Sequence, residues 1–456
     1  MYRYIVLLYV FFAVGAAAQD DFFGDITVDV EQELDEDRAW DVTGWVRQKA
    51  AYGFNQPDDR FSRNRRDWSS MQTDVFGRLD WQAGDNTALR ISANAIGDVI
   101  YRVKGDDNFS AEEVDEFETR FEWRDVYIES NVSNDAYVKI GRQIVAWGEA
   151  ENLRIVDLVN TQDQYTFGQQ DLENLRIPVP ALRVNYSVGD VLVDGVVTYK
   201  AGRDDIAPAG DEFDRFIDLR ATGARLVIDR PDKEMEALLR LSGHYGSGDW
   251  SVVGARVNAN QLDARQIQLA NIGMGNVLIE EVRLNQDRFS ALGAGINWTG
   301  GAWLAFAEMG LHRGKRLQPA DDALLNFTEG WPEKDQWLSA VGLEYSGWRN
   351  TTLTAEADYI LIAEHEDFLA EDRRQLGYSA RLRWTGLNER VQAIAVATQL
   401  PDQQGRVWRL TLDYDWSDSI ELGLLWVNYS AQPGAALYNY RHNDTVQFQF
   451  EYSFQR

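Results

Sequence analysis

The chain has 456 residues and a formal net charge of −28, from 45 basic and 73 acidic side chains. This charge excludes nucleic acid as a partner, because the phosphate backbone would be repelled. The absence of cysteine excludes disulfides, thiolate metal sites and cysteine nucleophiles. Aromatic residues are abundant, with 16 Trp, 19 Tyr and 20 Phe against only nine prolines.

The N-terminus has the features of a secretory signal peptide. Arg3 supplies a short basic region, residues 4–14 are apolar, and the three alanines at 16–18 form a cleavage pattern. The apolar run is too short for a membrane-spanning helix. We therefore predict a signal peptide over residues 1–18 and an exported chain. The acidic segment that follows, residues 19–40, is expected to lie in the periplasm.

The remainder of the chain, residues 41–456, alternates between apolar and polar side chains in short runs. Side chains on a strand point alternately to two faces, so this alternation predicts strands with one apolar and one polar face. Gly, Asn and Asp tolerate the positive φ of tight hairpins, so each cluster of them marks a turn. Eight such clusters occur, at residues 84–86, 133–135, 189–190, 246–248, 299–301, 347–350, 386–389 and 417–419.

Longer polar stretches separate these hairpins, and the asymmetry between short turns and long loops is typical of outer-membrane barrels. The hairpins, an opening strand near residues 42–52 and a closing strand predict an all-β, transmembrane, antiparallel up-and-down barrel of about 18 strands. A barrel of about 16 strands is the alternative, because residues 120–132 and 250–259 are weakly patterned. Residues 221–229 fit either an extra strand or a helix. Both termini would lie on the short-turn, periplasmic side.

The last strand has the clearest pattern in the chain. Phe448, Phe450, Tyr452 and Phe454 point one way, while Gln, Glu and Ser side chains between them point the other. An aromatic face beside a polar face suits lipid outside and water inside. This strand resembles the C-terminal strand of bacterial outer-membrane barrels, although two residues follow its final aromatic side chain. The resemblance implies that the barrel-assembly machinery recognises these aromatic residues.

Charged side chains are frequent on the polar faces of the strands. Charge is costly on a lipid-facing surface, so we expect these side chains to face a water-filled lumen. They either form cross-strand salt bridges that stiffen the barrel or create a field across the lumen that orients polar solutes. The set comprises Arg47, Arg78, Arg90, Arg142, Arg183 and Arg240 in the first half, and Glu308, Glu344, Glu356, Asp358, Arg381, Arg383, Arg409, Asp413, Asp415 and Glu451 in the second.

A secreted, soluble β-solenoid or sandwich acting as a binding protein is the main alternative fold, because it also uses alternating strands and polar turns. Trp and Tyr, however, recur near strand ends on the apolar face, as in the aromatic girdles of membrane barrels. Alternating arginines and carboxylates on the other face fit a lumen wall. The sequence therefore favours a barrel in the bacterial outer membrane, in contact with lipid and lipopolysaccharide.

The most distinctive local sequence spans residues 141–163 and begins Gly-Arg-Gln-Ile-Val-Ala-Trp-Gly. It resembles a family of Gram-negative outer-membrane β-barrel proteins of unknown function that carry a G-R-Q-x-x-x-W-G strand end. Members are porin-like and often associated with exporters of the resistance-nodulation-division type or with lipid-handling partners. The resemblance implies an exporter or periplasmic partner and a role in moving amphipathic or hydrophobic molecules.

This motif predicts a strand that ends at Trp147, followed by a sharp turn at Gly148. Beyond the turn, polar residues recur at near-helical spacing, so a segment folded into the barrel could present them to the pore and pack its apolar side on the wall. The candidates for a pore constriction are Arg142, Arg154, Asp157, Asn160 and Asp163. A surface loop with a purely structural role is the alternative.

Catalysis and metal binding have little support in the sequence. The four histidines are scattered, with no H-x-x-x-H pair, and no G-x-S-x-G elbow occurs. The acidic stretches 106–118 and 364–372 lack the spacing of a Ca²⁺ loop. We expect no cofactor, no metal site and no enzymatic activity, with an outer-membrane lipase or protease as the alternative. The predicted function is a porin-like channel, or the outer-membrane part of an export pathway, for small or amphipathic molecules.

Overall fold

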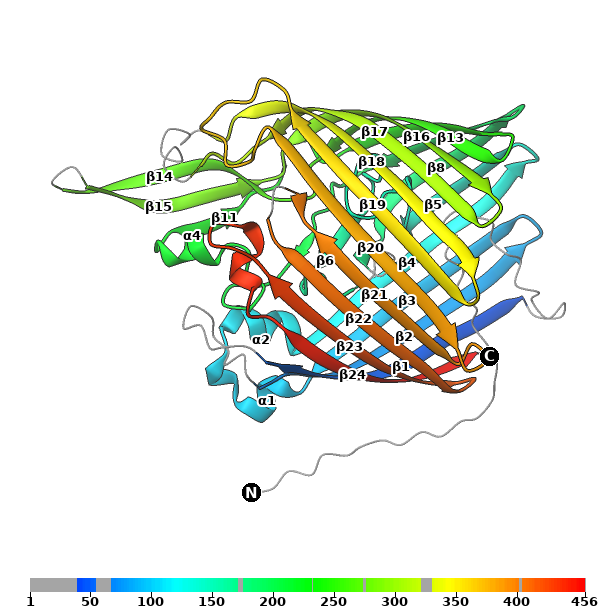
Figure 1. Cartoon of the computed structure of the whole chain (residues 1–456), viewed down its shortest axis with the longest axis horizontal. Helices are drawn as coiled ribbons and strands as arrows, with labels where there is room; N and C mark the ends of the chain where they lie inside the picture. Colours follow the sequence, from blue (N-terminus) through cyan, green and yellow to red (C-terminus); the bar gives the residue numbers. More distant parts are fainter. Residues whose placement is uncertain are drawn as a thin grey trace.

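A computed structural model of the chain describes residues 39–54, 67–170, 175–231, 233–273, 276–320, 330–401 and 404–455. The described chain forms one antiparallel sheet of 18 strands, in which β24 pairs with β1 and closes the barrel (Figure 1). The prediction of about 18 strands is therefore confirmed. The alternative of 16 is wrong, because both weakly patterned segments are wall strands. The predicted signal peptide and nearly all of the acidic segment 19–40 lie outside the described residues.

The wall strands follow one another around the barrel in chain order. They are β1 (Trp40–Gly53), β2 (Trp68–Gly84), β3 (Thr87–Asp98), β4 (Thr119–Ser133), β5 (Ala136–Gln143), β8 (Val179–Val188), β9 (Val191–Thr198), β12 (Glu236–Tyr245), β13 (Gly248–Asn258), β16 (Arg288–Gly300), β17 (Trp303–Arg316), β18 (Glu333–Trp348), β19 (Thr351–Ile362), β20 (Arg374–Gly386), β21 (Val391–Gln399), β22 (Arg406–Ser417), β23 (Ile420–Ser430) and β24 (Thr445–Gln455).

All eight predicted turns join neighbouring wall strands. Several contain the positive φ that such turns demand, among them Gly189 at 60°, Gly246 at 49° and Asn350 at 54°. Trp40 at the start of β1 pairs with Trp81 beside one of these turns, and Thr43 pairs with Gln455 at the end of β24. The start of the barrel, its end and the tight turns therefore share one side, as predicted.

The opposite side carries the longer connections, which hold the remaining elements. Two small sheets form there, one from β6 (Thr161–Gln164), β7 (Arg176–Ile177) and β10 (Asp205–Ile206), the other from β11 (Arg225–Ile228), β14 (Asp263–Gly273) and β15 (Asn276–Asn285). The β14–β15 hairpin projects away from the wall (Figure 1). The helical elements are α1 (Ile100–Lys104), η1 (Asp106–Asn108), α2 (Ala111–Phe117), α4 (Ile217–Ala221) and η4 (Ala436–Tyr440). The ambiguous residues 221–229 thus contain a strand, β11, outside the barrel.

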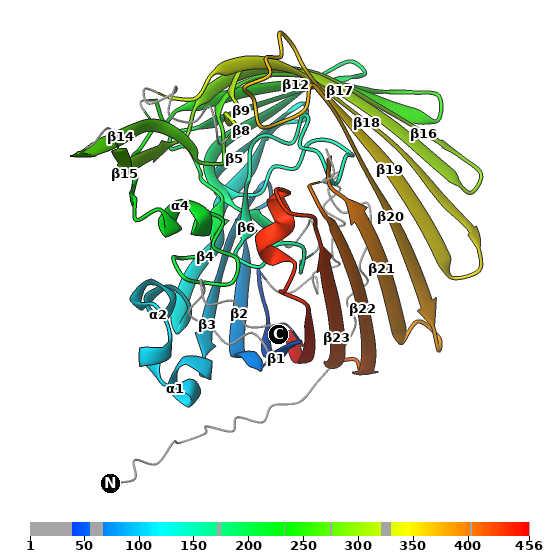
Figure 2. The same cartoon turned by 60° about the vertical axis from the view of Figure 1, so that its left-hand side comes forward.

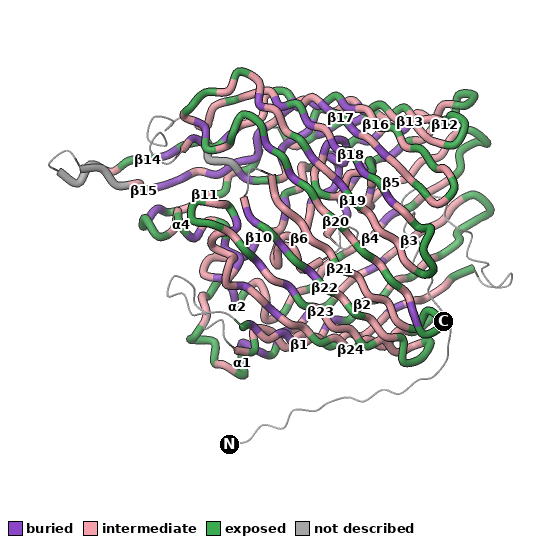
Figure 3. The backbone as a smooth tube through the Cα atoms, viewed as in Figure 1, coloured by how far each residue is buried: buried purple, intermediate pink, exposed green. Residues whose placement is uncertain are grey.

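The two faces of the wall differ in polarity, and exposure alternates along the strands (Figure 3). Exposed outward residues such as Leu292, Met309 and Phe448 are apolar, whereas inward Asp194 and Glu308 are buried. An apolar outside and a polar inside are the requirement for a barrel surrounded by lipid. The fold is therefore that of an outer-membrane barrel, and the soluble solenoid or sandwich is wrong. The helices in the described part of the chain are too short or too polar to cross a bilayer.

Candidate functional site

The connection between β5 and β8 enters the barrel, and its residues 144–160 are called the infolded loop below. Wall strand β5 ends at Gln143, so the predicted strand end at Trp147 is wrong. Side chains replace the regular pairing here: Gln143 Nε2 donates to the Ala181 carbonyl at 3.0 Å, and the Val145 amide donates to Asn160 Oδ1 at 2.7 Å. These side-chain bonds satisfy backbone groups that a longer strand would have paired.

Two glycines of the motif allow the chain to leave the wall. Gly141 has a φ of 132°, and a Cβ there would overlap the Val126 carbonyl of β4. Gly148 has a φ of 105°, and a Cβ there would lie 2.8 Å from Glu308 Oε1. L-residues with side chains rarely adopt such backbone conformations, and neither position has room for one. The two glycines are therefore needed for the path of the infolded loop.

Trp147 docks the infolded loop against the wall. Its side chain is only 1% exposed, and Nε1–H donates to Asp194 Oδ2 on β9 at 3.0 Å. The same Asp194 forms a 2.7 Å ion pair with Arg183 on β8. Arg183 was expected to face the lumen, and it does point inward, but its charge is neutralised and covered. The buried pair supplies the acceptor that a buried indole N–H requires.

Two wall glutamates hold the far end of the infolded loop. Glu308 on β17 accepts the amides of Glu149 and Ala150, the second at 3.3 Å. Glu356 on β19 accepts the amides of Glu151 and Asn152, each at 3.0 Å. Carboxylates are strong acceptors for unpaired backbone N–H groups. The sequence predicted both glutamates as inward charges but missed this anchoring role, because nothing local in the sequence connects them to residues 149–152.

The apolar side chains of the infolded loop fill hollows in the inner wall. Val145, Ile155, Val156 and Val159 are at most 2% exposed and belong to one core cluster with wall residues of β8, β9, β12, β13, β16 and β18. The wall has room for them because Gly293 and Gly310 carry no side chain: a Cβ there would lie 2.5 Å from Val156 Cγ1 and 2.7 Å from Ile155 Cγ2. The expected contact between the apolar residues and the wall is present.

The near-helical spacing of polar residues beyond Gly148 does not reflect a helix, because residues 144–160 form none. Asp157 and Asn160 are 6% and 0% exposed, so they hold the loop together and do not face the pore. Arg154 donates to the carbonyl of Asp157 at 2.9 Å and to that of Asn160, and Asp157 also pairs with Arg176 at 3.1 Å. Side-chain bonds of this kind replace the repeating backbone bonds of a helix.

The other two constriction candidates lie near the small sheet of β6, β7 and β10. Asp163 is on β6, directly opposite Asp205 of β10 in the strand register. It is also close enough to Lys49 on β1 for their charges to attract. Arg142 at the end of β5 lies within electrostatic range of Asp205 as well. The structure thus separates the candidates into a loop-stabilising group and a group near this sheet. That Arg142, Arg154 and Asp163 line a constriction remains a prediction.

Contacts near the long-loop side connect opposite walls, which the sequence did not predict. The Tyr429 hydroxyl on β23 donates to the Phe167 carbonyl, and the Tyr440 hydroxyl donates to the Phe213 carbonyl at 3.1 Å. Figure 2 shows η4 (red), which contains Tyr440, on the same side of the molecule as α4, and Asn439 Nδ2 donates to Asp218 Oδ2 at 2.7 Å. Segments that follow β5 and β9 therefore reach β23 and the β23–β24 connection, and this places polypeptide across the lumen.

Most of the predicted inward arginines are paired. The ion pairs are Arg47–Glu451 at 2.6 Å, Arg78–Asp80 at 2.9 Å, Arg90–Asp80 at 2.5 Å, and Arg381–Glu151 at 2.7 Å. This geometry supports cross-strand salt bridges over a field across the lumen. The other charges named from the sequence lie at inward strand positions: Arg240, Glu344, Asp358, Arg383, Arg409, Asp413 and Asp415. Their effect on solutes remains a prediction.

Asp205 gives the β6–β7–β10 sheet an expected pH dependence. Burial, with the nearby carboxylates of Asp163 and Glu122, raises the pKa of Asp205 to about 7. Because this folded-state pKa exceeds the unfolded one, the contribution of Asp205 to stability is full below about pH 4 and is lost as the pH rises to about 7. Because intrinsic amide exchange itself speeds up with pH, the quantity to compare is the protection factor, and protection around residues 204–206 is expected to be greater at pH 5 than at pH 8. Asp205→Asn removes the carboxyl group, so the change in protection between pH 5 and pH 8 is expected to shrink. The same change in the variant and in the unaltered protein would contradict the role of Asp205.

The closed barrel, its apolar outer surface and its infolded loop define the class of this protein: an outer-membrane β-barrel. The chain belongs to the family described as protein of unknown function (DUF1302), whose model matches residues 3–454. The family resemblance predicted from the sequence is confirmed at this level.

Solved structures extend the comparison. OccAB3 of Acinetobacter baumannii is similar with a TM-score of 0.54 at 9% identity, over 91% of this chain and 99% of that one. OccAB1 of the same organism has a TM-score of 0.52 at 7% identity, over 91% and 96%. The outer membrane channel DcaP, also of A. baumannii, has a TM-score of 0.42 at 10% identity, over 91% and 97%. The two OccAB likenesses show the shared barrel fold. No curated protein matches the sequence.

Proposed function

We propose that this protein is a porin-like channel in which the infolded loop narrows the passage. The observation that carries the proposal is that, among the described residues, this loop is bonded to the wall along one side of the barrel. Its bonds to wall residues reach Asp194 on β9, Glu308 on β17, Glu356 on β19 and Arg381 on β20. Solutes would therefore pass between the loop and the remaining wall.

That remaining wall determines which solutes we expect to pass. It presents charged groups of both signs, including the Arg47–Glu451 pair and Asp80 with its two arginines. Paired charges of this kind interact with polar groups of either sign without giving the lumen one dominant sign. This supports small polar or amphipathic molecules as the solutes.

The wider setting of the protein is also part of the proposal. The apolar outer surface supports contact with lipid and lipopolysaccharide. The C-terminal resemblance supports recognition of Phe448, Phe450, Tyr452 and Phe454 by the barrel-assembly machinery. An exporter or periplasmic partner rests on the motif resemblance alone. The absence of catalysis, of a cofactor and of a metal remains a prediction, with a barrel lipase or protease as the alternative.

Shortening the infolded loop tests the channel. In planar bilayers the unaltered protein is expected to give stepwise single-channel currents. Replacing residues 149–153 by two glycines is expected to raise the conductance several-fold, because it removes the part of the loop furthest from β5. The matched control shortens the β14–β15 hairpin, which lies outside the barrel, and should leave the conductance unchanged.

Two outcomes would contradict the proposal in different ways. Correctly folded protein that gives no current steps would refute the channel itself. Current steps of equal size before and after shortening the infolded loop would leave the channel in place but refute the constriction.

A further inference from the structure

One carboxamide lies in the middle of the lipid-facing surface. Gln48 pairs directly with Phe450 across the β1–β24 seam, and Phe450 is an exposed outward residue, so both side chains share the outer face. Trp40 is the first residue of β1, and Tyr52 is the last but one. Gln48 is therefore at mid-depth, between the aromatic ends of the strand.

Other outward carboxamides in the described wall strands are at or near strand ends. Gln399 is the last residue of β21, and Asn428 is three positions from the start of the β23–β24 connection. Val46 on β1 and Phe448 on β24 are apolar at nearby outward positions, whereas Thr73 on β2, which pairs with Gln48, carries a hydroxyl. Polar side chains in the membrane are costly and mark sites of contact or function. Lipid chains cannot hydrogen-bond the Gln48 carboxamide, so its place on this surface indicates a polar partner.

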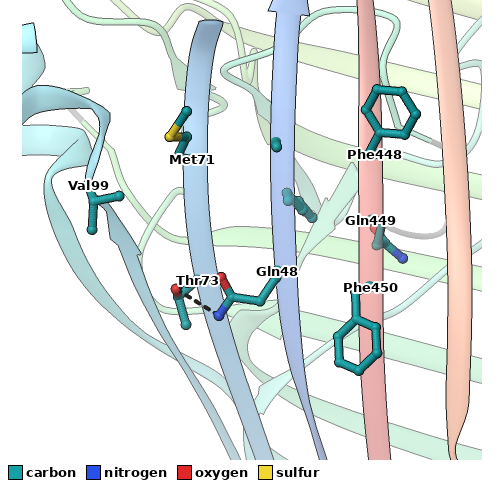
Figure 4. Close-up of a pocket in the computed structure, with 9 residues that line it drawn as sticks. Gln48, Met71, Thr73, Val99, Phe448, Gln449 and Phe450 are labelled. Atoms are coloured by element: carbon teal, nitrogen blue, oxygen red, sulfur yellow. Dashed lines mark hydrogen bonds between the residues drawn. The ribbon is translucent and has the colours of Figure 1, made fainter. Parts of the chain in front are cut away.

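The nearest polar group satisfies Gln48 only in part. Gln48 and Thr73 on β2 exchange hydrogen bonds, Nε2 to Oγ1 at 2.9 Å and Oγ1 to Oε1 at 3.0 Å (Figure 4). A carboxamide has two N–H donors and an oxygen that can accept twice. Thr73 can engage one donor and one acceptor position, so a donor and an acceptor position remain. A hydrocarbon tail offers neither, whereas a second carboxamide offers both.

The surface around Gln48 combines a recess with projecting aromatic side chains. A recess of about 340 Å³ lies here, bordered by Met71 and Val99 on one side and by Phe448 and Phe450 on the other (Figure 4). The two phenylalanines are 54% and 43% exposed, so they stand out beside the recess. A two-fold rotation of this face onto itself would bring the phenylalanines of one copy towards the recess of the other. Closed two-fold contacts use one patch in this way.

We propose that the β24–β1–β2 face is the contact between two copies of this chain in the membrane. The phenylalanines of each copy fill the recess of the other, and the two Gln48 carboxamides hydrogen-bond across the two-fold axis. Hydrogen bonds between carboxamides stabilise the association of membrane segments because lipid cannot replace them. This contact involves the outer surface and does not depend on the proposed channel in the lumen.

A single introduced cysteine tests the contact directly, because the chain contains none of its own. Gln48→Cys, oxidised in outer membranes, is expected to give a disulfide-linked species whose mass equals two chains. Leu292→Cys on β16 is the matched control: the position is outward and 60% exposed, but lies on the far side of the barrel. It should give several-fold less linked product. Equal linkage in both variants, linkage in neither, or a linked species containing another protein would overturn the proposal.

Native mass spectrometry provides the second measurement and does not depend on the cysteine variants. The unaltered protein in mild detergent is expected to contain two copies, and Gln48→Leu is expected to shift it towards one. Detection of only single copies of the unaltered protein, with bound lipid, would assign the recess to an acyl chain and overturn the proposal.

Discussion

Replacing Trp147 by alanine is expected to detach the infolded loop from the wall and raise the single-channel conductance. The indole is 1% exposed and its N–H is bonded to Asp194, so the substitution removes both packing and a hydrogen bond. Truncating a buried tryptophan to alanine costs about 3–5 kcal/mol. That cost falls on the loop, because Trp147 contacts the wall from the inside and belongs to no wall strand.

Two further variants separate packing from hydrogen bonding at this position. Trp147→Phe keeps most of the buried surface but loses the bond to Asp194, so its conductance is expected to lie between those of the unaltered protein and Trp147→Ala. The barrel itself should remain folded in both, which its resistance to denaturation in detergent before heating can verify. A conductance in Trp147→Ala equal to that of the unaltered protein would show that the loop stays in place without its tryptophan.

The second large effect is expected at Gly141. Alanine here must adopt a φ near 132° while its Cβ overlaps the Val126 carbonyl on the adjacent strand. A strained backbone of this kind costs about 1–3 kcal/mol, and the overlap with β4 adds to it because the obstacle is backbone. Gly141→Ala is therefore expected to lower the midpoint of urea unfolding, followed by tryptophan fluorescence, and to reduce the yield of folded barrel.

The control for this experiment is Gly254→Ala on β13. Gly254 has no positive φ, and a Cβ there would meet no atom within 4 Å. Its substitution is expected to be neutral or to stabilise by about 0.4–1 kcal/mol, because alanine loses less backbone freedom on folding. Equal midpoints for the two variants would mean that β5 can rearrange at Gly141, and the glycine would then be unnecessary for the loop path.

The pairing of charges in the lumen illustrates where prediction from sequence succeeded and where it failed. The alternation of side chains correctly placed Arg47 and Glu451 on inward faces, and the register of β1 with β24 makes them partners. The same alternation assigned Glu308 to the inner wall but could not reveal that it holds the amide of a residue 159 positions away. Near-helical spacing around Asp157 was misleading, because that segment is shaped by distant partners.

The sequence by itself determined the barrel: its tight turns, its alternating faces and its closing aromatic strand. These features depend on a period of two residues and on local backbone preferences, so each strand carries its own signal. Only the tertiary structure decided which long connection enters the lumen and what holds it there. The anchors Asp194, Glu308 and Glu356 lie 47, 158 and 205 positions from the residues they hold, and the two glutamates meet the infolded loop only when the curved wall brings β17 and β19 round to it.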